Sequence, residues 1–384
     1  MQITLISALN LIFSCATSEP VSLEELTADL CRQDVVFLGE EHDNTEGHKM
    51  QLAIVQSLHK QRKDMVISME MFERDVQGVL NDYLRGRIDE ATFLAHSRPW
   101  PNYKRHYRPL VEYAKEHGLD VIASNAPRRS ARKVAQGGGD PSAHVARSTS
   151  APKNQYWLLF KEAMKDHPGE IPESALHNMY AAQCLKDDTM AESIVDYMIS
   201  RPHRRPLIVH LCGKFHSDLG LGTHARVLKR RPLTRTSVVS MESFEDRAET
   251  ALKTAKERGH YLIAVPKEPT KESQATAKAK QPNKEEKPKE EERELLPAGL
   301  GIMPDYSGED PGVLVNAVSE DGAAEAAGIK ANDLIIKIGK ESIESLDDYM
   351  AVMADHYAGD KVKVTIERGD SELVLDVTLS ARRR

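Results

Sequence analysis

The sequence predicts an α/β domain, with a mostly parallel sheet and helices on both faces, followed by a small β-rich domain. Three observations in the 384 residues support this fold class. Up to residue 266, short apolar segments of strand length alternate with segments of helical periodicity. Residues 267–296 are densely charged and almost free of apolar side chains, which predicts a disordered linker. Residues 297–384 then alternate short β-like segments with amphipathic helices.

The composition excludes several classes of protein. Hydrophobic residues make up 40% of the chain, which is enough for a folded core. With 52 basic and 59 acidic residues, the net charge of −7 gives no overall positive field for binding nucleic acid. Beyond the N-terminus, no apolar run approaches the roughly 20 residues of a membrane-spanning helix. Four scattered cysteines are too few for a disulfide scaffold or a zinc ribbon.

The first residues predict an export signal. Residues 1–14 are apolar and uncharged over about the length of a signal-peptide core, and Cys15 follows where the chain becomes polar. Residues 12–15 resemble a bacterial lipobox, which implies cleavage before Cys15 and a lipid on its thiol. We therefore expect a leader over residues 1–19 and a periplasm-facing lipoprotein of the bacterial cell envelope, with this lipid as its only membrane contact. The alternative is a buried first strand.

The large domain is expected at residues 20–266. An amphipathic segment at 46–61 follows the first strand and a helical segment at 76–84 follows the second. Short apolar strands separated by helices form open parallel sheets, in which ligands bind beyond the carboxyl ends of the strands. The predicted strands are 34–39, 65–70, 120–125, 206–212, 236–241 and 260–265.

Polar side chains follow four of these strands. Gly39 and Gly213 allow sharp turns, so that a side chain three residues later can point back over the sheet edge. Singly, each polar residue is more often a helix cap or a solvated loop residue, but together they indicate one site. Histidine and carboxylate side chains suit a divalent transition metal. The residues are Glu40, His42, Glu70, Glu73, Asn125, Arg128 and His216.

Four motifs resemble a known superfamily. Two G-x-x-H motifs occur, at Gly39–His42 and Gly213–His216, as in the superfamily that unites ChaN-type haem-uptake proteins, Tiki proteases and erythromycin-esterase-like enzymes. Residues 182–191 resemble the helical Gln…Asp-x-x-Met-Ala segment of the ChaN branch, and residues 122–128 also fit that branch. The resemblance covers most of residues 30–265.

The ChaN branch implies an iron-regulated lipoprotein that binds haem, in at least one case through a tyrosine at a dimer interface. A homodimer is therefore one expected assembly. No motif fixes the position of that tyrosine, so Tyr103, Tyr107 and Tyr180 are candidates in polar helical surroundings. Each is otherwise explained as a rim aromatic with its hydroxyl in water. No Cys-x-x-Cys-His motif for covalent haem attachment occurs.

The Tiki branch implies a different cofactor, a metal ion held by the paired histidines and by glutamates. Carried over to this sequence, the metal ligands are His42, His216, Glu40 and Glu70. In a hydrolase of this type, Glu40, Glu70 or Glu73 is the expected catalytic carboxylate. The two family segments add supporting residues, which are Asn125, Arg128, Gln183 and Asp187.

The small domain, at residues 297–384, resembles a bacterial PDZ domain of the type found in periplasmic proteases. Strands are expected at 312–318, 332–339, 361–367 and 372–379, and helices at 322–329 and 345–357. The resemblance implies a loop that receives the terminal carboxylate of a peptide or protein partner, beside a strand edge that pairs with it. Any one of the peptide-binding candidates is more often an ordinary core residue; the candidates are Leu300, Gly301, Ile302, Tyr349 and Met353.

Three functional hypotheses follow. The first is an envelope lipoprotein that takes part in iron uptake by binding haem, iron or another metal, and recruits a partner through its small domain. The second is a metal-dependent hydrolase, such as a peptidase, in which a glutamate activates a metal-bound water. The third is an adaptor without catalytic activity. The cofactor is thus haem or a divalent transition metal.

Overall fold

The chain divides into two compact units, Met1–Glu268 and Pro269–Arg384, which are described separately. The computed structural model describes residues 11–139, 142–165, 171–201, 203–244, 248–267, 298–304, 312–319, 322–343, 346–354, 356–369 and 371–381. The start of the predicted leader and the predicted linker from residue 268 onwards lie outside these residues. Among the residues described, no helix is both long and apolar enough to span a bilayer.

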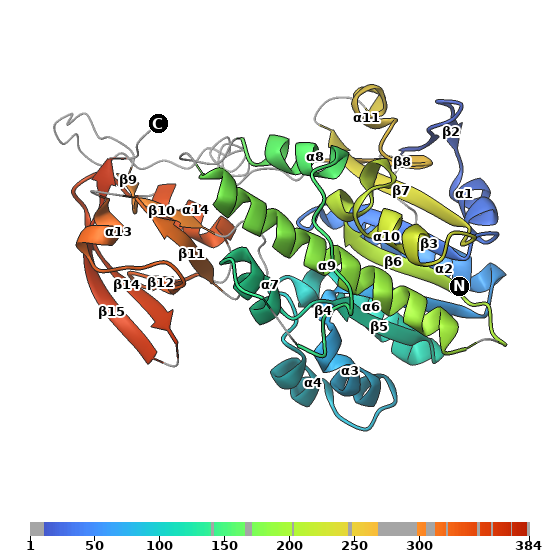
Figure 1. The fold of residues 1–384 in the computed structure, drawn as a ribbon, viewed down its shortest axis with the longest axis horizontal. Helices are drawn as coiled ribbons and strands as arrows, with labels where there is room; N and C mark the ends of the chain where they lie inside the picture. The colour runs from blue at the N-terminus through green and yellow to red at the C-terminus, as the bar shows by residue number, and fades with distance from the viewer. Residues whose placement is uncertain are drawn as a thin grey trace, which may run out of the picture. The chain divides into compact units, whose positions relative to one another are not determined.

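The first unit is built on one sheet with eight strands (Figure 1). Its strands are β1 (Leu11–Ser14), β2 (Pro20–Val21), β3 (Val35–Glu40), β4 (Met65–Glu73), β5 (Asp120–Asn125), β6 (Leu207–Gly213), β7 (Thr236–Phe244) and β8 (Tyr261–Pro266). Its helices are α1 (Leu23–Leu30), α2 (Thr45–Gln61), α3 (Gln77–Leu84), α4 (Glu90–Ser97), α5 (Tyr103–His106), α6 (Arg108–His117), α7 (Arg128–Ala135), α8 (Gln155–Ala163), α9 (Glu173–Ile199), α10 (Gly222–Arg230) and α11 (Ala248–Ala255).

The strands follow the order β2-β1-β8-β7-β3-β6-β4-β5. Strands β8, β7, β3, β6, β4 and β5 are parallel, and β1 and β2 join antiparallel at one end. The predicted fold class is confirmed. The order also makes β3 and β6 neighbours, although they are far apart in the sequence, and places β6 between β3 and β4.

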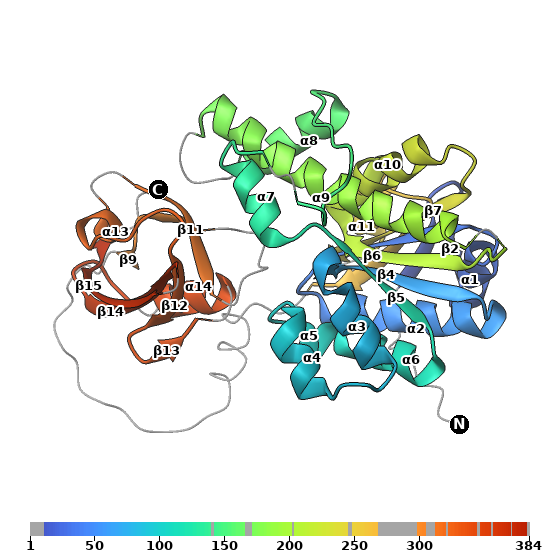
Figure 2. The same ribbon diagram turned by 60° about the horizontal axis from the view of Figure 1, so that its bottom comes forward.

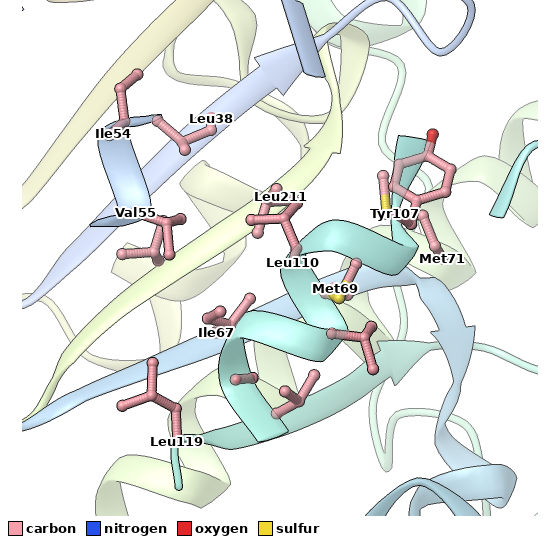
Figure 3. Packing of buried hydrophobic residues seen from close by; sticks show 14 of the residues in the cluster. Leu38, Ile54, Val55, Ile67, Met69, Met71, Tyr107, Leu110, Leu119 and Leu211 are labelled. Carbon is pink, nitrogen blue, oxygen red and sulfur yellow. The ribbon is translucent and has the colours of Figure 1, made fainter. Parts of the chain in front are cut away.

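Helices cover both faces of this sheet, with α2 and α6 on one face and α9 and α10 on the other (Figure 2). Side chains alternate between the two faces along each strand. Leu38 and Leu211 pack with Ile54 of α2 in the first layer (Figure 3), while Phe37 packs with Ile194 of α9 in the second. Both layers are buried, so the sheet presents mainly its edges to solvent.

The apolar segment before Cys15 is part of this fold. Strand β1 pairs along its length with β8, and Ile12 and Phe13 are only 5% and 4% exposed. The backbone N–H of Cys15 donates to the carbonyl of His260, and burial raises the pKa of the Cys15 thiol to about 11. From Leu11 onwards the structure therefore shows the buried first strand, which was the alternative to a separate leader.

The second unit is a small β-rich fold, as predicted. Its main sheet runs β10-β11-β12-β14-β15, with β13 paired to β12, and β9 pairs with β16. These strands are β9 (Ala298–Gly299), β10 (Ile302–Pro304), β11 (Val313–Val318), β12 (Leu334–Ile338), β13 (Glu341–Ser342), β14 (Lys361–Arg368), β15 (Ser371–Thr378) and β16 (Ser380–Ala381). The helices are α13 (Ala323–Ala326) and α14 (Leu346–Ala354).

Candidate functional site

The two G-x-x-H loops lie side by side at the carboxyl edge of the sheet, because Glu40 at the end of β3 is in register with Gly213 at the end of β6. Both glycines are required by this close approach. A Cβ atom on Gly39 would lie 2.8 Å from Ser217 Oγ and 2.9 Å from Lys214 Cα. A Cβ atom on Gly213 would lie 2.8 Å from Cε1 and Nε2 of His42.

Glu40 is a buried carboxylate with both oxygens engaged. Its Oε1 accepts hydrogen bonds from His42 Nδ1 at 2.9 Å and from the Tyr107 hydroxyl at 2.6 Å, and its Oε2 accepts one from Gln51 Nε2 at 2.5 Å. Burial raises the pKa of Glu40, but the charge of His48 and the hydrogen bonds outweigh it and lower the pKa below its usual value. Glu40 is therefore an ionised partner for His42.

His42 is fixed from two sides. Its backbone carbonyl accepts hydrogen bonds from His48 Nε2 at 3.0 Å and Asn102 Nδ2 at 2.8 Å. Its ring meets Trp100 edge to face, with 4.9 Å between ring centroids. The side chain is 39% exposed, and its Nε2 has no hydrogen-bond partner among the described residues. The His42 ring is thus held in place, while its Nε2 atom has no partner among the described residues.

A second carboxylate–histidine pair lies on the opposite face of the sheet. Glu70 of β4 accepts the backbone N–H of Gly213 at 2.7 Å, and its other oxygen lies 3.1 Å from His216 Nε2. His216 Nδ1 lies 2.7 Å from Asp187 Oδ1 on α9. Burial lowers the pKa of His216, but the charges of Glu70 and Asp187 outweigh it and raise the pKa to about 10. His216 is a buried imidazolium held between two carboxylates.

The two pairs are coupled through His42. Burial lowers the pKa of His42, while Glu40 and Glu70 raise it above its usual value and the charge of His216 opposes them. The structure therefore brings His42, His216, Glu40 and Glu70 together, with the two carboxylates on opposite faces of the sheet.

The predicted metal ligands do not form a ready ion site. Within the described parts of the chain, no three His, Cys, Asp or Glu side chains are arranged to hold a metal ion. The carboxylate oxygens of Glu40 and Glu70 instead accept hydrogen bonds and form ion pairs with the histidines. The hydrolase hypothesis, which needs such an ion, gains no support from this arrangement.

Glu73, Asn125 and Arg128 form a different contact. After an irregularity in β4, Glu73 pairs in register with Asn125 of β5. Its carboxylate is 2.7 Å from Arg98 and 3.5 Å from Arg128 in two ion pairs. Glu73, predicted as a catalytic carboxylate, is thus a partner of two arginines rather than of either site histidine.

The expected surroundings of the three tyrosines are wrong, because all three side chains are buried. The Tyr107 hydroxyl donates to Glu40, and that of Tyr180 donates to the Pro152 carbonyl at 3.0 Å. Tyr103 packs against the ring of Phe72. None of these hydroxyls lies in water, so none can meet a ligand at the surface without rearrangement.

Gln183 connects His216 to an aromatic cluster. Its amide lies 3.2 Å from His216 Nε2 and 3.3 Å from the Tyr156 hydroxyl, and the Tyr156 ring stacks on Phe215 at 5.0 Å. Tyr156 is buried, whereas Phe215 is partly exposed. A partly exposed aromatic surface therefore adjoins the polar site.

Sequence reasoning missed His48, Gln51 and Asn102. A usable signal was present for two of them, since His48 and Gln51 share the buried face of α2 with Met50 and Ile54. Polar side chains in an apolar helical stripe need partners inside the protein.

Most of the predicted peptide-binding residues of the small unit belong to its core. Leu300, Tyr349 and Met353 are at most 7% exposed and pack in one cluster, against which Ile302 is partly buried. Gly301 has a φ of 73°, which favours glycine. Strand β10 stands at the end of the sheet order, so among described strands only β11 pairs with it. Strand β15 stands at the other end of the same order.

Comparisons with known proteins agree with this architecture. A solved structure of ChaN of Campylobacter jejuni, described as showing cofacial heme binding, has a TM-score of 0.52 and 17% identity and covers 67% of this chain and 97% of that one. At this identity the likeness shows the fold alone.

Two curated relatives match shorter stretches. The serine endoprotease DegS of Escherichia coli K12 is 40% identical over 68 residues, which are 18% of this chain and 19% of DegS. The chloroplastic protein RETICULATA-RELATED 5 of Arabidopsis thaliana is 31% identical over 107 residues, 26% of this chain and 15% of that protein. The chain thus matches less than a fifth of either relative's length.

Two family models match this chain. A PDZ domain model matches residues 298–379, the second unit. The model described as haem-binding uptake, Tiki superfamily, ChaN matches residues 26–227, more than half of the chain. The chain belongs to the ChaN family of the Tiki superfamily and carries a C-terminal PDZ domain.

Proposed function

We propose that the large domain binds haem at the carboxyl edge of its sheet, beside the two G-x-x-H loops, and that the PDZ domain recruits a peptide or protein partner. Family membership supports haem as the cofactor. The proposal rests on the state of the His42 side chain, which is partly exposed. One of its ring nitrogens is held by a buried carboxylate, and the other has no partner among the described residues.

The donor chemistry at this edge fits a haem. Imidazole is a common haem-iron ligand, and a metal-binding histidine typically gives its second nitrogen to a carboxylate, as His42 does with Glu40. Bound haem would supply an iron that accepts one such nitrogen. Phe215 adds partly exposed aromatic surface. The buried tyrosines fit less well, because their hydroxyls are directed into the protein.

A haem titration of the full chain tests this function. We expect a saturable Soret band with wild-type protein and at least a tenfold weaker affinity in His42→Ala. His96→Ala is the matched control, because His96 is an exposed histidine on α4 whose ring bonds only to Thr92 of the same helix among the described residues. A wild-type chain that takes up no haem would refute the proposal.

The PDZ domain is proposed to bind the C-terminal carboxylate of its partner beside β10, with the partner's backbone adding to the strand edge. A set of labelled C-terminal decapeptides, measured by fluorescence anisotropy with the full chain, tests this. We expect binding by some peptides with a free carboxylate and loss of that binding when the same peptides are amidated. Equal binding of free and amidated peptides would contradict the proposal.

An envelope location is also proposed. The relatives include a probable periplasmic serine endoprotease of Rickettsia prowazekii, 37% identical over 70 residues, and a haem protein outside the cytoplasm would suit iron uptake. A lipid on Cys15 is the part that the fold opposes, because cleavage before Cys15 would remove β1. Mass spectrometry of the protein isolated from bacterial membranes would distinguish a lipidated N-terminal Cys15 from a chain that retains β1.

A further inference from the structure

We propose that the edge of the large sheet at which its parallel strands begin binds the surface of a membrane that contains anionic phospholipids. This amino edge is formed by residues 31–34, 60–64, 203–206 and 231–235, which precede β3, β4, β6 and β7. It lies at the opposite end of the strands from the two G-x-x-H loops. The inference depends neither on haem binding nor on a lipid on Cys15.

The sheet topology gathers these four segments, which are far apart in the sequence. Strand β3 pairs in parallel with both β6 and β7 near their first residues, and β6 pairs in the same way with β4. The guanidinium of Arg62 links three of the segments, because it donates to the carbonyl of Gln33 at 2.6 Å and to that of Arg205. The four segments therefore form one continuous surface.

This surface is strongly basic, although the whole chain carries a net charge of −7. The four segments contain eight lysines and arginines but only two aspartates, which gives them a net charge of +6. Asp34 lies 2.9 Å from Arg235, and Asp64 pairs with Arg204, so both carboxylates are already neutralised. Among the residues described, no ion pair engages the other exposed basic side chains of the edge, which are Arg32, Lys60, Lys63, Arg205 and Arg231.

Two large aliphatic side chains are exposed at the same edge. Leu233 is 94% exposed and lies between Arg231 and Arg235 in the sequence. Ile199, the last residue of α9, is 59% exposed. Arg201 lies 3.7 Å from Asp120 at the start of β5, which places the end of α9 at this edge. One exposed leucine alone is ordinary, but here basic side chains surround the aliphatic ones.

This combination suits an anionic bilayer. Each lysine or arginine near an anionic membrane surface strengthens binding by about fivefold, and an aliphatic side chain gains further free energy when it enters the headgroup region. A nucleic acid duplex would engage the charges but leave the aliphatic groups in water. On a membrane bound in this way, the two G-x-x-H loops would face away from the lipid.

Co-sedimentation of the full chain with phospholipid vesicles tests the inference. Protein purified with an unmodified Cys15 is used, so that its side chains alone account for binding. The probes are vesicles of phosphatidylglycerol mixed with phosphatidylcholine, and vesicles of phosphatidylcholine alone. We expect binding to the anionic vesicles that weakens as salt is added, and little binding to the uncharged ones.

Charge reversal tests the basic side chains. Arg205→Glu/Arg231→Glu should weaken binding to the anionic vesicles by about tenfold or more. Lys337→Glu/Lys340→Glu is the matched control, because it changes the net charge equally at two exposed lysines of the second unit, and it should bind like the wild type. Circular dichroism checks that the variants fold, as expected for substitutions on the surface.

A second pair of variants tests the aliphatic contribution. Leu233→Ser should weaken binding to the anionic vesicles by about threefold or more, because it removes the apolar group from the headgroup region. Leu158→Ser is the control, since Leu158 is 64% exposed on α8, outside the amino edge, and its replacement should leave binding unchanged.

Three results would overturn the inference. The first is no binding to the anionic vesicles, or equal binding to both kinds. The second is unchanged affinity in Arg205→Glu/Arg231→Glu. The third is unchanged affinity in Leu233→Ser, or tighter binding of a DNA duplex than of the anionic vesicles, because the edge would then be a general site for polyanions. The haem titration is independent of all three, so the haem function stands or falls separately.

Discussion

Gly213 lies directly against His42, so closely that a Cβ atom on Gly213 would fall 2.8 Å from His42 Nε2. The two residues come from separate G-x-x-H motifs. The backbone N–H of the same glycine donates to Glu70, so Gly213 joins the two carboxylate–histidine pairs. A single small residue thus lets both pairs share one edge of the sheet.

Gly213→Ala should displace His42 and weaken haem binding by about tenfold or more, because misplaced ligands lose that much affinity. A haem titration of the full chain measures this. Gly78→Ala is the matched control, since a Cβ atom on this exposed glycine in α3 meets nothing within 4 Å. It should leave haem affinity unchanged and slightly stabilise the helix. Equal haem affinity in Gly213→Ala and wild type would show that the two loops are packed less tightly than this short distance indicates.

The sequence predicted the architecture well because strand signals are local. Each parallel strand was recognised from its own apolar residues, and the glycines of the two G-x-x-H motifs pointed to turns. The pairing of Glu40 with Gly213 could not be read from the sequence, because it depends on the order of strands in the folded sheet. Glu40 and Glu70 lie on opposite faces because side chains alternate along each strand and both β3 and β4 pair in register with β6.

The tyrosines show where local reasoning failed. Tyr103, Tyr107, Leu110, Val111 and Ala114 follow at helical spacing and are all buried. This stripe predicts burial of the aromatic rings, but the charged residues between them suggested a polar segment. The Tyr107 hydroxyl donates to Glu40, which lies in a distant segment of the chain, and no local sequence pattern predicts such a contact.

The raised pKa of His216, about 10, predicts that stability depends on pH. An unfolded histidine has a pKa near 6.5, so the folded chain holds this proton more tightly. The stabilisation is complete below about pH 6.5 and is lost as the pH rises through about 10. The free energy of unfolding in urea should therefore fall as the pH rises through this range.

His216→Gln should remove this part of the pH dependence, whereas His96→Gln, at an exposed position, should retain it. The difference between variants isolates His216 from other groups that titrate in the same range. Parallel curves for wild type and His216→Gln would mean that the charges of Glu70 and Asp187 do not hold the proton.

Phe13→Ala tests whether β1 is part of the folded chain. Phe13 is 4% exposed and packs against Leu262, so its truncation should lower the free energy of unfolding by about 3 kcal/mol. Leu11→Ala, in the same strand at a position that is 38% exposed, should change it by less than about 0.5 kcal/mol. Chemical denaturation of both purified variants gives the comparison. Similar small effects would favour a leader that does not contribute to the fold.

Met353→Ala should lower the stability of the PDZ domain by about 2–5 kcal/mol, since Met353 is 7% exposed in the core cluster. Met350, in the same helix but 43% exposed, provides the matched control, and its replacement by alanine should cost less than about 0.5 kcal/mol. Calorimetry of the full chain resolves the transition of each unit. If Met353→Ala leaves the unfolding transition unchanged, Met353 does not contribute to the core and is again a candidate for the peptide groove.

The most direct measurement of the haem site is chemical rescue of His42→Gly by free imidazole. The variant leaves a space where the ring stood, and the account predicts that its altered Soret spectrum returns to the wild-type form as imidazole is added. His96→Gly should have a wild-type spectrum without imidazole. If His42→Gly alone already shows the wild-type haem spectrum, the iron is held elsewhere and the site described here is not the haem site.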